Sequence, residues 1–159
     1  MVSNPYRFGY ITNVLRIRQL MDKMTRFVDV MVFNTKNQLL LLKRCENAEF
    51  MPSKWCLPGG HVENGSLIEN AQRELEEETG IIASQLYLMK GTNWTYESGD
   101  ACTTVFVTFM DFIGEQIPRI TITEHSEYKF FDIDSLPKKD MLPELYDIIK
   151  YVLKINDKR

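Results

Sequence analysis

The alternation of hydrophobic and polar residues predicts where the strands of this chain lie. Residues 27 to 33 (FVDVMVF) are rich in β-branched residues, and residues 38 to 44 (QLLLLKR) form a nearly continuous apolar run. The polar NTKN between them is typical of a turn, so the two segments predict a hairpin whose second strand is buried. Further strands are expected at residues 86 to 95, 102 to 112 and 127 to 132.

Elsewhere in the chain, apolar residues recur three or four positions apart, and this spacing predicts helices. One covers residues 13 to 24, with Asn13 available as its cap. Another follows Pro143, a residue that suits the start of a helix. Its apolar face carries Leu145, Ile148, Ile149, Val152 and Leu153. Strands and helices together predict an α/β fold with a mixed sheet and helices around it.

The central helix has the sharpest boundaries in the sequence. Ser66 followed by Glu69 fits a capping box, in which the Ser oxygen accepts the N3 amide and the Glu carboxylate accepts the cap amide. Gly80 suits the left-handed residue that ends a helix. The helix is therefore expected from about Leu67 to Thr79. Its predicted buried stripe is Leu67, Ala71 and Leu75, with Ile68 alongside.

Length and composition fit a single globular domain. The 159 residues are 44% apolar and 11% aromatic, which is enough for a real hydrophobic core. No internal repeat and no linker rich in Pro, Gly or Ser divides the chain. We expect a helical extension over residues 1–25 and one domain over residues 26–159.

Charge, cysteine content and hydropathy narrow the class of function. A net charge of −3 argues against a broad nucleic-acid surface and favours a small-molecule ligand. Cys45, Cys56 and Cys102 are odd in number and form no C-x-x-C, so reduced thiols are expected. The apolar runs are too short for a membrane span, and MVSNPYRFGY lacks the features of a signal peptide. We therefore expect a cytoplasmic protein.

Three glutamates of the central helix lie at helical spacing on one face. Glu74, Glu77 and Glu78 are three and four residues apart, and they crowd the C-terminal end of the helix. Their mutual repulsion and the helix dipole both disfavour this arrangement. One interpretation is a solvated acidic face. The other is a site for a hard divalent cation, favoured by the PGG turn that precedes the helix, because such ions bind carboxylate and carbonyl oxygens.

The segment GGHVENGSLIENAQRELEEETGI closely resembles the Nudix box. That pattern is a Gly, five residues, a Glu, seven residues and then R-E-U-x-E-E-x-G-U, with U apolar. The second half matches at every specified position. The matching residues are Arg73, Glu74, Leu75, Glu77, Glu78, Gly80 and Ile81. The order of strands before and after the box also resembles the Nudix fold, an α/β/α sandwich.

The resemblance implies a hydrolase that requires Mg²⁺ or Mn²⁺ and acts on a nucleoside diphosphate derivative or a nucleoside triphosphate. It implies metal ligation by Glu74, Glu77 and Glu78 together with the carbonyl of Gly60. It also implies that Arg73 orients these carboxylates through a salt bridge. Glu77, Glu78 and Arg73 would thus be catalytic. A monomer or a homodimer is expected.

The first half of the box departs from the pattern. Counted from Gly60, Arg73 arrives one residue early and the first consensus Glu is missing. Glu63 is a possible partial substitute for it. The alternative is that Glu63 and His61 are a structural pair in the loop.

Downstream, residues 124 to 133 (EHSEYKFFDI) resemble the late strand of the family, which often carries an acid or a base into the metal site. Glu124, His125 and Glu127 are the candidates here. A catalytic His125 would fit the alternative of a GDP-sugar hydrolase that attacks carbon. A protein of this fold that binds nucleotides without turnover is a further alternative. Trp94, Tyr96 and Trp55 are candidates for stacking on a nucleotide base, although packing in the core or at its rim would also explain them.

Overall fold

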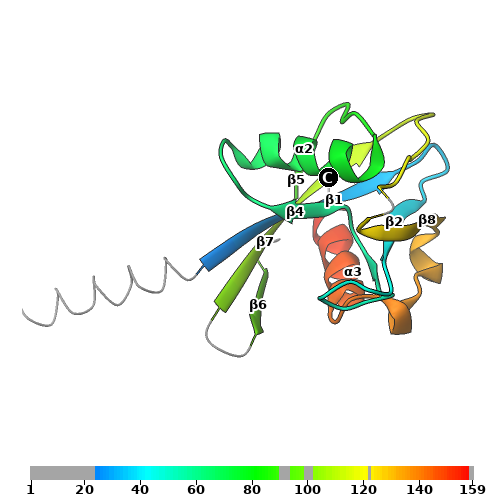
Figure 1. The fold of residues 1–159 in the computed structure, drawn as a ribbon. Coiled ribbons are helices and arrows are strands. Elements are labelled where there is room, and N and C mark those ends of the chain that lie inside the picture. The colour runs from blue at the N-terminus through cyan, green and yellow to red at the C-terminus, as the bar shows by residue number, and fades with distance from the viewer. Residues whose placement is uncertain (1–23, 90–93, 99–101, 122, 158–159) are drawn as a thin grey trace, which may run out of the picture.

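The computed structural model describes residues 24–89, 94–98, 102–121 and 123–157 (Figure 1). Side-chain surroundings are described for 25–89, 108–121 and 123–157. The strands are β1 Met24–Phe33, β2 Leu39–Arg44, β3 Trp55–Cys56, β4 Gly59–His61, β5 Tyr87–Leu88, β6 Trp94–Ser98, β7 Cys102–Phe112 and β8 His125–Phe131. The helices are α2 Leu67–Thr79 and α3 Leu145–Asn156, with 3₁₀ turns at Ile133–Ser135 and Lys138–Asp140.

The strands form one mixed sheet. Its order is β3-β2-β1-β7-β5, with β4 also pairing β1, β6 pairing β7 and β8 pairing β2. β1 and β7 are parallel over the whole of β1, from Met24 opposite Thr103 to Phe33 opposite Phe112. The other pairs are antiparallel. β1 and β2 meet at Phe33 and Leu39, which confirms the predicted hairpin.

Alternate residues of β1 and β2 face opposite sides of this sheet, as strand geometry requires. Val28, Val30 and Val32 pack in the core beneath α2, whereas Met31 and Phe33 pack in the core beneath α3. The four leucines of β2 divide in the same way, so the continuous apolar run is buried on both faces. In Figure 1, α2 lies above the sheet and α3 below it. The expected α/β/α sandwich is confirmed.

Helix α2 begins and ends where its caps predict. Ser66 and Glu69 form the reciprocal capping box, and Gly80 takes the left-handed conformation at φ 65°. Ala71 and Leu75 are fully buried as expected. The prediction for Ile68 was wrong, because its side chain is 41% exposed. Asn70 is buried in its place, on the side of the helix that faces β4 and the following loop.

Other expected elements differ at their boundaries. The single strand expected over residues 86 to 95 is two strands, because β5 and β6 each pair with a different part of β7. Met24, the last residue of the expected first helix, begins β1, and residues 13 to 23 lie outside the described part of the chain. In α3, Leu145, Ile149 and Val152 are buried, while Ile148 and Leu153 pack at its margin.

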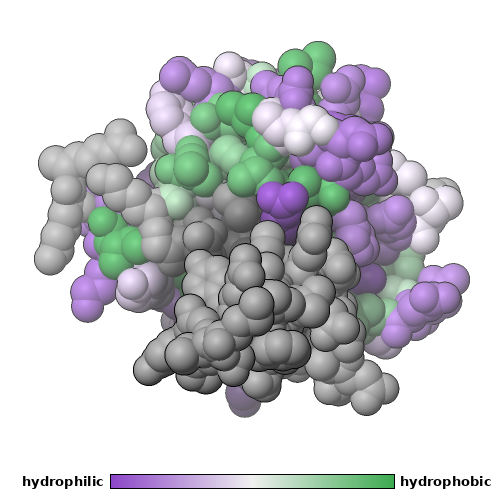
Figure 2. Space-filling view, turned by 90° about the vertical axis from the view of Figure 1, so that its left-hand side faces the viewer, coloured by the Kyte–Doolittle hydropathy of each residue, from purple (hydrophilic) through white to green (hydrophobic). Residues whose placement is uncertain are grey.

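Within the described ranges, neither the length nor the hydropathy of any helix suffices to cross a membrane. Figure 2 views the molecule from the left-hand side of Figure 1. Hydrophobic and hydrophilic residues are intermixed over the described surface on that side.

Candidate active site

The short strand β4 lies against α2 and fixes two of its glutamates. The Gly59 amide donates a hydrogen bond to Oε2 of Glu78, with 2.9 Å between N and O. Gly60 lies so close to Glu74 that a Cβ at this position would overlap the Glu74 carboxylate. Two adjacent glycines thus let the backbone of β4 approach two carboxylates that lie one helical turn apart.

Arg73 forms ion pairs with two of the three glutamates, Glu74 and Glu77. Its guanidinium lies 2.7 Å from Oε1 of Glu74 and 3.0 Å from Oε2 of Glu77. It also donates to the carbonyl of His61 and to Oδ1 of Asn70, each at 3.1 Å. Because the guanidinium has several donors in a fixed plane, it ties the helix to the loop after β4 as well as to two carboxylates.

The loop between β4 and α2 is also ordered by a buried amide. Oδ1 of Asn70 accepts from the Glu63 amide, and its Nδ2 donates to the carbonyls of Asn64 and Ser66. The ring of His61 packs on Phe27, with centroids 3.9 Å apart. These contacts favour the structural interpretation of Glu63 and His61.

The side chains of Glu74, Glu77 and Glu78 lie in different surroundings. The side chains of Glu74 and Glu78 are 13% and 10% exposed, whereas that of Glu77 is 58% exposed. The pKa of Glu78 is raised to about 8, chiefly by burial. The hydrogen bond from Gly59 opposes this shift, and the nearby carboxyls of Glu74, Glu124 and Asp29 add to it. Burial also raises the pKa of Glu74, although Arg73 opposes this. Helical spacing placed the three on one side but did not predict which would be buried.

The segment after β7 brings Glu124 and His125 against the end of α2. The Arg119 amide donates to the carbonyl of Thr79, and the Thr121 side chain donates to the carbonyl of Glu77. These are carbonyls of the last helical turn, which have no partner within the helix. Glu124 is fixed from the other side, because its carbonyl accepts the Cys45 amide. Residues far apart in the sequence therefore meet at one site.

His125 lies beneath this site and is only 2% exposed. Its Nδ1 is 3.8 Å from Oε1 of Glu78, and its Nε2 is 3.6 Å from Sγ of Cys56. Burial and, to a smaller extent, the positive charge of Arg44 together lower the pKa of His125 to about 4. The imidazole is therefore neutral near pH 7.

The geometry of the site fits a divalent cation. Glu78, Glu124 and His125 each offer one ligand atom, and these atoms all lie within 4.8 Å of one another. Among the residues that the structure describes, Nδ1 of His125 has no hydrogen-bond partner although it is buried. Two neighbouring carboxylates, one of them the buried Glu78 with a raised pKa, beside an unpartnered nitrogen are the arrangement that a bound cation would stabilise.

Two residues near the site were missed by the sequence analysis. Asp29 of β1 is 9% exposed and lies beside Gly59, and burial raises the pKa of Asp29 to about 8. The only signal was one acid within the apolar strand FVDVMVF. Arg44 pairs with His125 across β2 and β8 and lies 6.0 Å from the ring of Phe50, which is 48% exposed.

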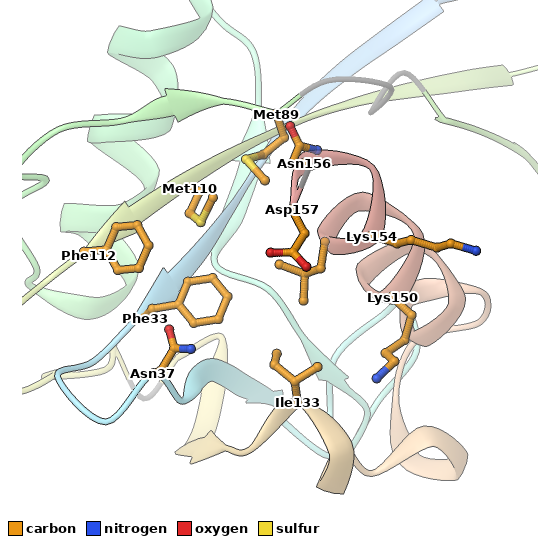
Figure 3. A pocket seen from close by; sticks show the side chains of 11 residues that line it. Phe33, Asn37, Met89, Met110, Phe112, Ile133, Lys150, Lys154, Asn156 and Asp157 are labelled. Atoms are coloured by element: carbon orange, nitrogen blue, oxygen red, sulfur yellow. The ribbon is translucent and has the colours of Figure 1, made fainter. Parts of the chain in front are cut away.

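The candidate base-stacking residues Trp94 and Tyr96 lie in β6, and their side chains are outside the described part of the structure. A cavity of about 480 Å³ lies on the opposite face of the sheet, beside α3 (Figure 3). Phe33, Met110 and Leu153 contribute to its apolar lining. The residues that form it include none of the predicted site residues.

Comparison with known proteins identifies the family. Residues 23–152 match the family described as the NUDIX domain. The chain belongs to the Nudix family. This match extends over both core layers and the whole candidate site, far beyond the box itself.

Several Nudix proteins are similar over much of the chain. The nucleoside triphosphatase NudI of Escherichia coli strain E24377A is 34% identical over 114 residues, which are 71% of each chain. The asymmetrical bis(5'-nucleosyl)-tetraphosphatase of Rattus norvegicus is 31% identical over 104 residues, 65% of this chain and 58% of that protein. The chain thus spans little more than half of some curated relatives. The MutT protein of Methanosarcina mazei shares the fold, with a TM-score of 0.71 and 24% sequence identity. The match covers 85% of this chain and 96% of that protein.

The structure also indicates how the Nudix box should be aligned. Gly59 binds Glu78, and a count from Gly59 rather than Gly60 places Arg73 at the specified distance. Gly65 then occupies the position of the first glutamate, so this residue is replaced rather than deleted. Gly65 has a φ of 92°, and a Cβ there would lie 2.8 Å from Oε2 of Glu69. The capping box of α2 therefore requires a glycine at position 65, because a side chain there would collide with the Glu69 carboxylate.

Replacing Gly60 by Ala tests the close approach of β4 to α2. The new Cβ would displace the Glu74 carboxylate from Arg73, so we expect lower hydrolytic activity in a protein that remains folded. Gly114→Ala is the matched control. Gly114 has a φ of 59° and open space around it, so the control should lose about 1 kcal/mol of stability but keep its activity. Unchanged turnover in Gly60→Ala would show that the position of Glu74 is not critical.

Proposed function

We propose that this Nudix protein is a divalent-metal-dependent hydrolase that cleaves a phosphoanhydride bond of a nucleoside triphosphate or a nucleoside diphosphate derivative. The observation that carries the proposal is the pair of buried carboxylates Glu78 and Glu74, which Gly59 and Arg73 respectively hold in place. A cluster whose carboxyl pKa values are raised is costly without a cation. Proteins retain such an unfavourable arrangement at functional sites, here where a divalent cation would be needed for hydrolysis.

The residues that would hold the ion are Glu74, Glu77 and Glu78, together with the carbonyl of Gly60 and with Glu124. Their oxygen atoms suit Mg²⁺ or Mn²⁺. When bound, such an ion supplies Lewis acidity at the phosphoryl group and lowers the pKa of water. Arg73 orients two of the carboxylates through the short contacts described above.

Proton transfer in the proposed reaction is assigned to a carboxylate. Glu124 is exposed and lies within 4.8 Å of Glu78, so water and substrate can reach it. We assign it the role of accepting the proton of the attacking water. Glu74 is a second candidate because burial raises its pKa, which makes it a better base than an ordinary glutamate.

The relatives support a substrate that contains a chain of phosphates. NudI is named a nucleoside triphosphatase, and the rat protein is named a bis(5'-nucleosyl)-tetraphosphatase. We infer that Arg44 contacts the phosphates and that Phe50 contacts the base. This inference rests on the exposed Phe50 ring and on the position of Arg44 opposite His125 in the sheet.

Attack at a sugar carbon is the less favoured alternative. It requires a base beyond the phosphates, and His125 was the candidate for this role. His125 is buried, and its pKa is lowered to about 4, so it is a weak base that water does not reach directly. A binding protein without turnover is the other alternative, and the complete Arg73, Glu74, Glu77, Glu78 set argues against it.

Hydrolysis in oxygen-18 water identifies the bond that breaks. We expect the label in a phosphate product, because the proposed reaction is attack of water on phosphorus. The substrates to screen are nucleoside triphosphates, dinucleoside polyphosphates, ADP-ribose and nucleotide sugars, each with Mg²⁺ and with Mn²⁺. The products separate the alternatives. Label in a released sugar would favour the nucleotide-sugar hydrolase, and metal-dependent binding without any labelled product would favour the non-catalytic protein.

A further inference from the structure

The imidazole of His125 is a buried group of the site whose role the proposed hydrolysis leaves open. It is 2% exposed, and its Nδ1 has no hydrogen-bond partner within the described ranges. A buried polar atom without a partner is costly, so its retention calls for an explanation. Nδ1 lies 3.8 Å from Oε1 of Glu78, too far for a hydrogen bond, and it is aimed at the carboxylate cluster.

The contacts of Cys56 favour one tautomer of His125. The Cys56 thiol donates its proton to the carbonyl of Leu42, with 3.4 Å between S and O. While the thiol donates to Leu42, its sulfur can act only as an acceptor toward Nε2 of His125, at 3.6 Å. In this arrangement the ring proton lies on Nε2. Nδ1 then carries a lone pair, and this lone pair faces the carboxylates.

Three electron-pair donors therefore converge on one small space. The ligand atoms of Glu78, Glu124 and His125 lie within 4.8 Å of one another. Lone pairs that face each other repel unless a proton or a cation lies between them. A cation that accepts an imidazole nitrogen as well as carboxylate oxygens satisfies all three at once, and Mn²⁺ accepts this mixture better than Mg²⁺, which prefers oxygen alone.

We propose that Nδ1 of His125 is a metal ligand, and that with Glu78 and Glu124 it forms a cation position selective for Mn²⁺ over Mg²⁺. The proposal rests on the proposed function in that Glu78 and Glu124 serve both. Cys56 is then a positioning residue, because its sulfur keeps the ring proton on Nε2 and leaves Nδ1 free to bind the metal.

Pulsed electron paramagnetic resonance of the Mn²⁺-loaded full chain tests this directly. Directly bound imidazole gives ¹⁴N couplings to the metal electron, which a shell of oxygen ligands does not give. The chain has two histidines, so incorporation of ¹⁵N-labelled histidine should replace the ¹⁴N pattern by a ¹⁵N pattern without any substitution. His61→Ala should keep the coupling, and His125→Gln should abolish it. We also expect His125→Gln to reduce the preference for Mn²⁺ over Mg²⁺ in competition binding by ~10-fold or more.

Bound Mn²⁺ without a histidine nitrogen coupling would overturn the inference, as would a coupling that survives in His125→Gln. Either result leaves phosphoanhydride hydrolysis standing, because that proposal is tested by the oxygen-18 label. Failure to bind Mn²⁺ or Mg²⁺ at all would instead overturn both.

Discussion

Glu78→Gln is expected to lower kcat by roughly 10²- to 10³-fold, the scale on which loss of one preorganised electrostatic group reduces catalysis. The substitution removes the negative charge from the most buried carboxylate of α2 but keeps its size. The Gln oxygen can still accept the hydrogen bond from Gly59, so the local geometry should be retained. Steady-state kinetics over a range of Mg²⁺ and Mn²⁺ concentrations would measure the loss.

Neighbouring glutamates of the same helix provide matched controls. Glu76→Gln changes an exposed residue that faces away from the buried side of α2, so it should keep full activity. Glu77→Gln removes an exposed carboxylate bound to Arg73, and we expect a loss between those of the other two variants. Full activity in Glu78→Gln would contradict the assignment of this residue as a metal ligand.

The core of the fold could be predicted because its signals are local. The caps and period of α2 are all contained in one short segment, and the leucines of β2 are apolar on both faces. The edge of the sheet was harder to predict. β5 has only two residues and depends on its pairing with β7, which lies more than ten residues downstream. Ile68 is apolar but points to solvent, because the same turn of α2 buries Asn70 against the loop.

Residue spacing alone predicted the site only where its residues share an element, and Gly60, Glu124 and His125 were predicted from the family resemblance. Glu74, Glu77 and Glu78 follow from helical spacing, and the family resemblance assigned them a role. Their different burial depends on β4 and on the segment after β7, which approach from other parts of the sequence. Asp29 shows the same limit, because a single acid within an apolar strand does not reveal that it faces Gly59.

In the absence of divalent cations, the free energy of unfolding is expected to fall as the pH rises from about 4.5 to 8. Burial raises the pKa of Asp29 from 3.8 to about 8, and burial first and then neighbouring acids raise that of Glu78 from 4.5 to about 8. A carboxyl whose pKa is raised by folding contributes its full stability below the unfolded pKa and loses it as the pH approaches the folded pKa. A tenfold change in proton affinity corresponds to about 1.4 kcal/mol, so the two groups together change the stability by several kcal/mol, a large part of the roughly 5–15 kcal/mol typical of a domain.

Urea unfolding at pH 5, 6.5 and 8 in the presence of a chelator would measure this slope. Asp29→Asn and Glu78→Gln should each flatten it and stabilise the metal-free protein at pH 8, whereas Glu76→Gln should leave it unchanged. The effects of the first two should not be additive, because Asp29 is itself one of the charges that raise the pKa of Glu78. Mn²⁺ should stabilise the native chain most at high pH, where Glu78 is ionised, and this gain should be small in Glu78→Gln. A stability that is flat or rises between pH 5 and 8 in all four proteins would show that these carboxyls are better solvated than their burial implies.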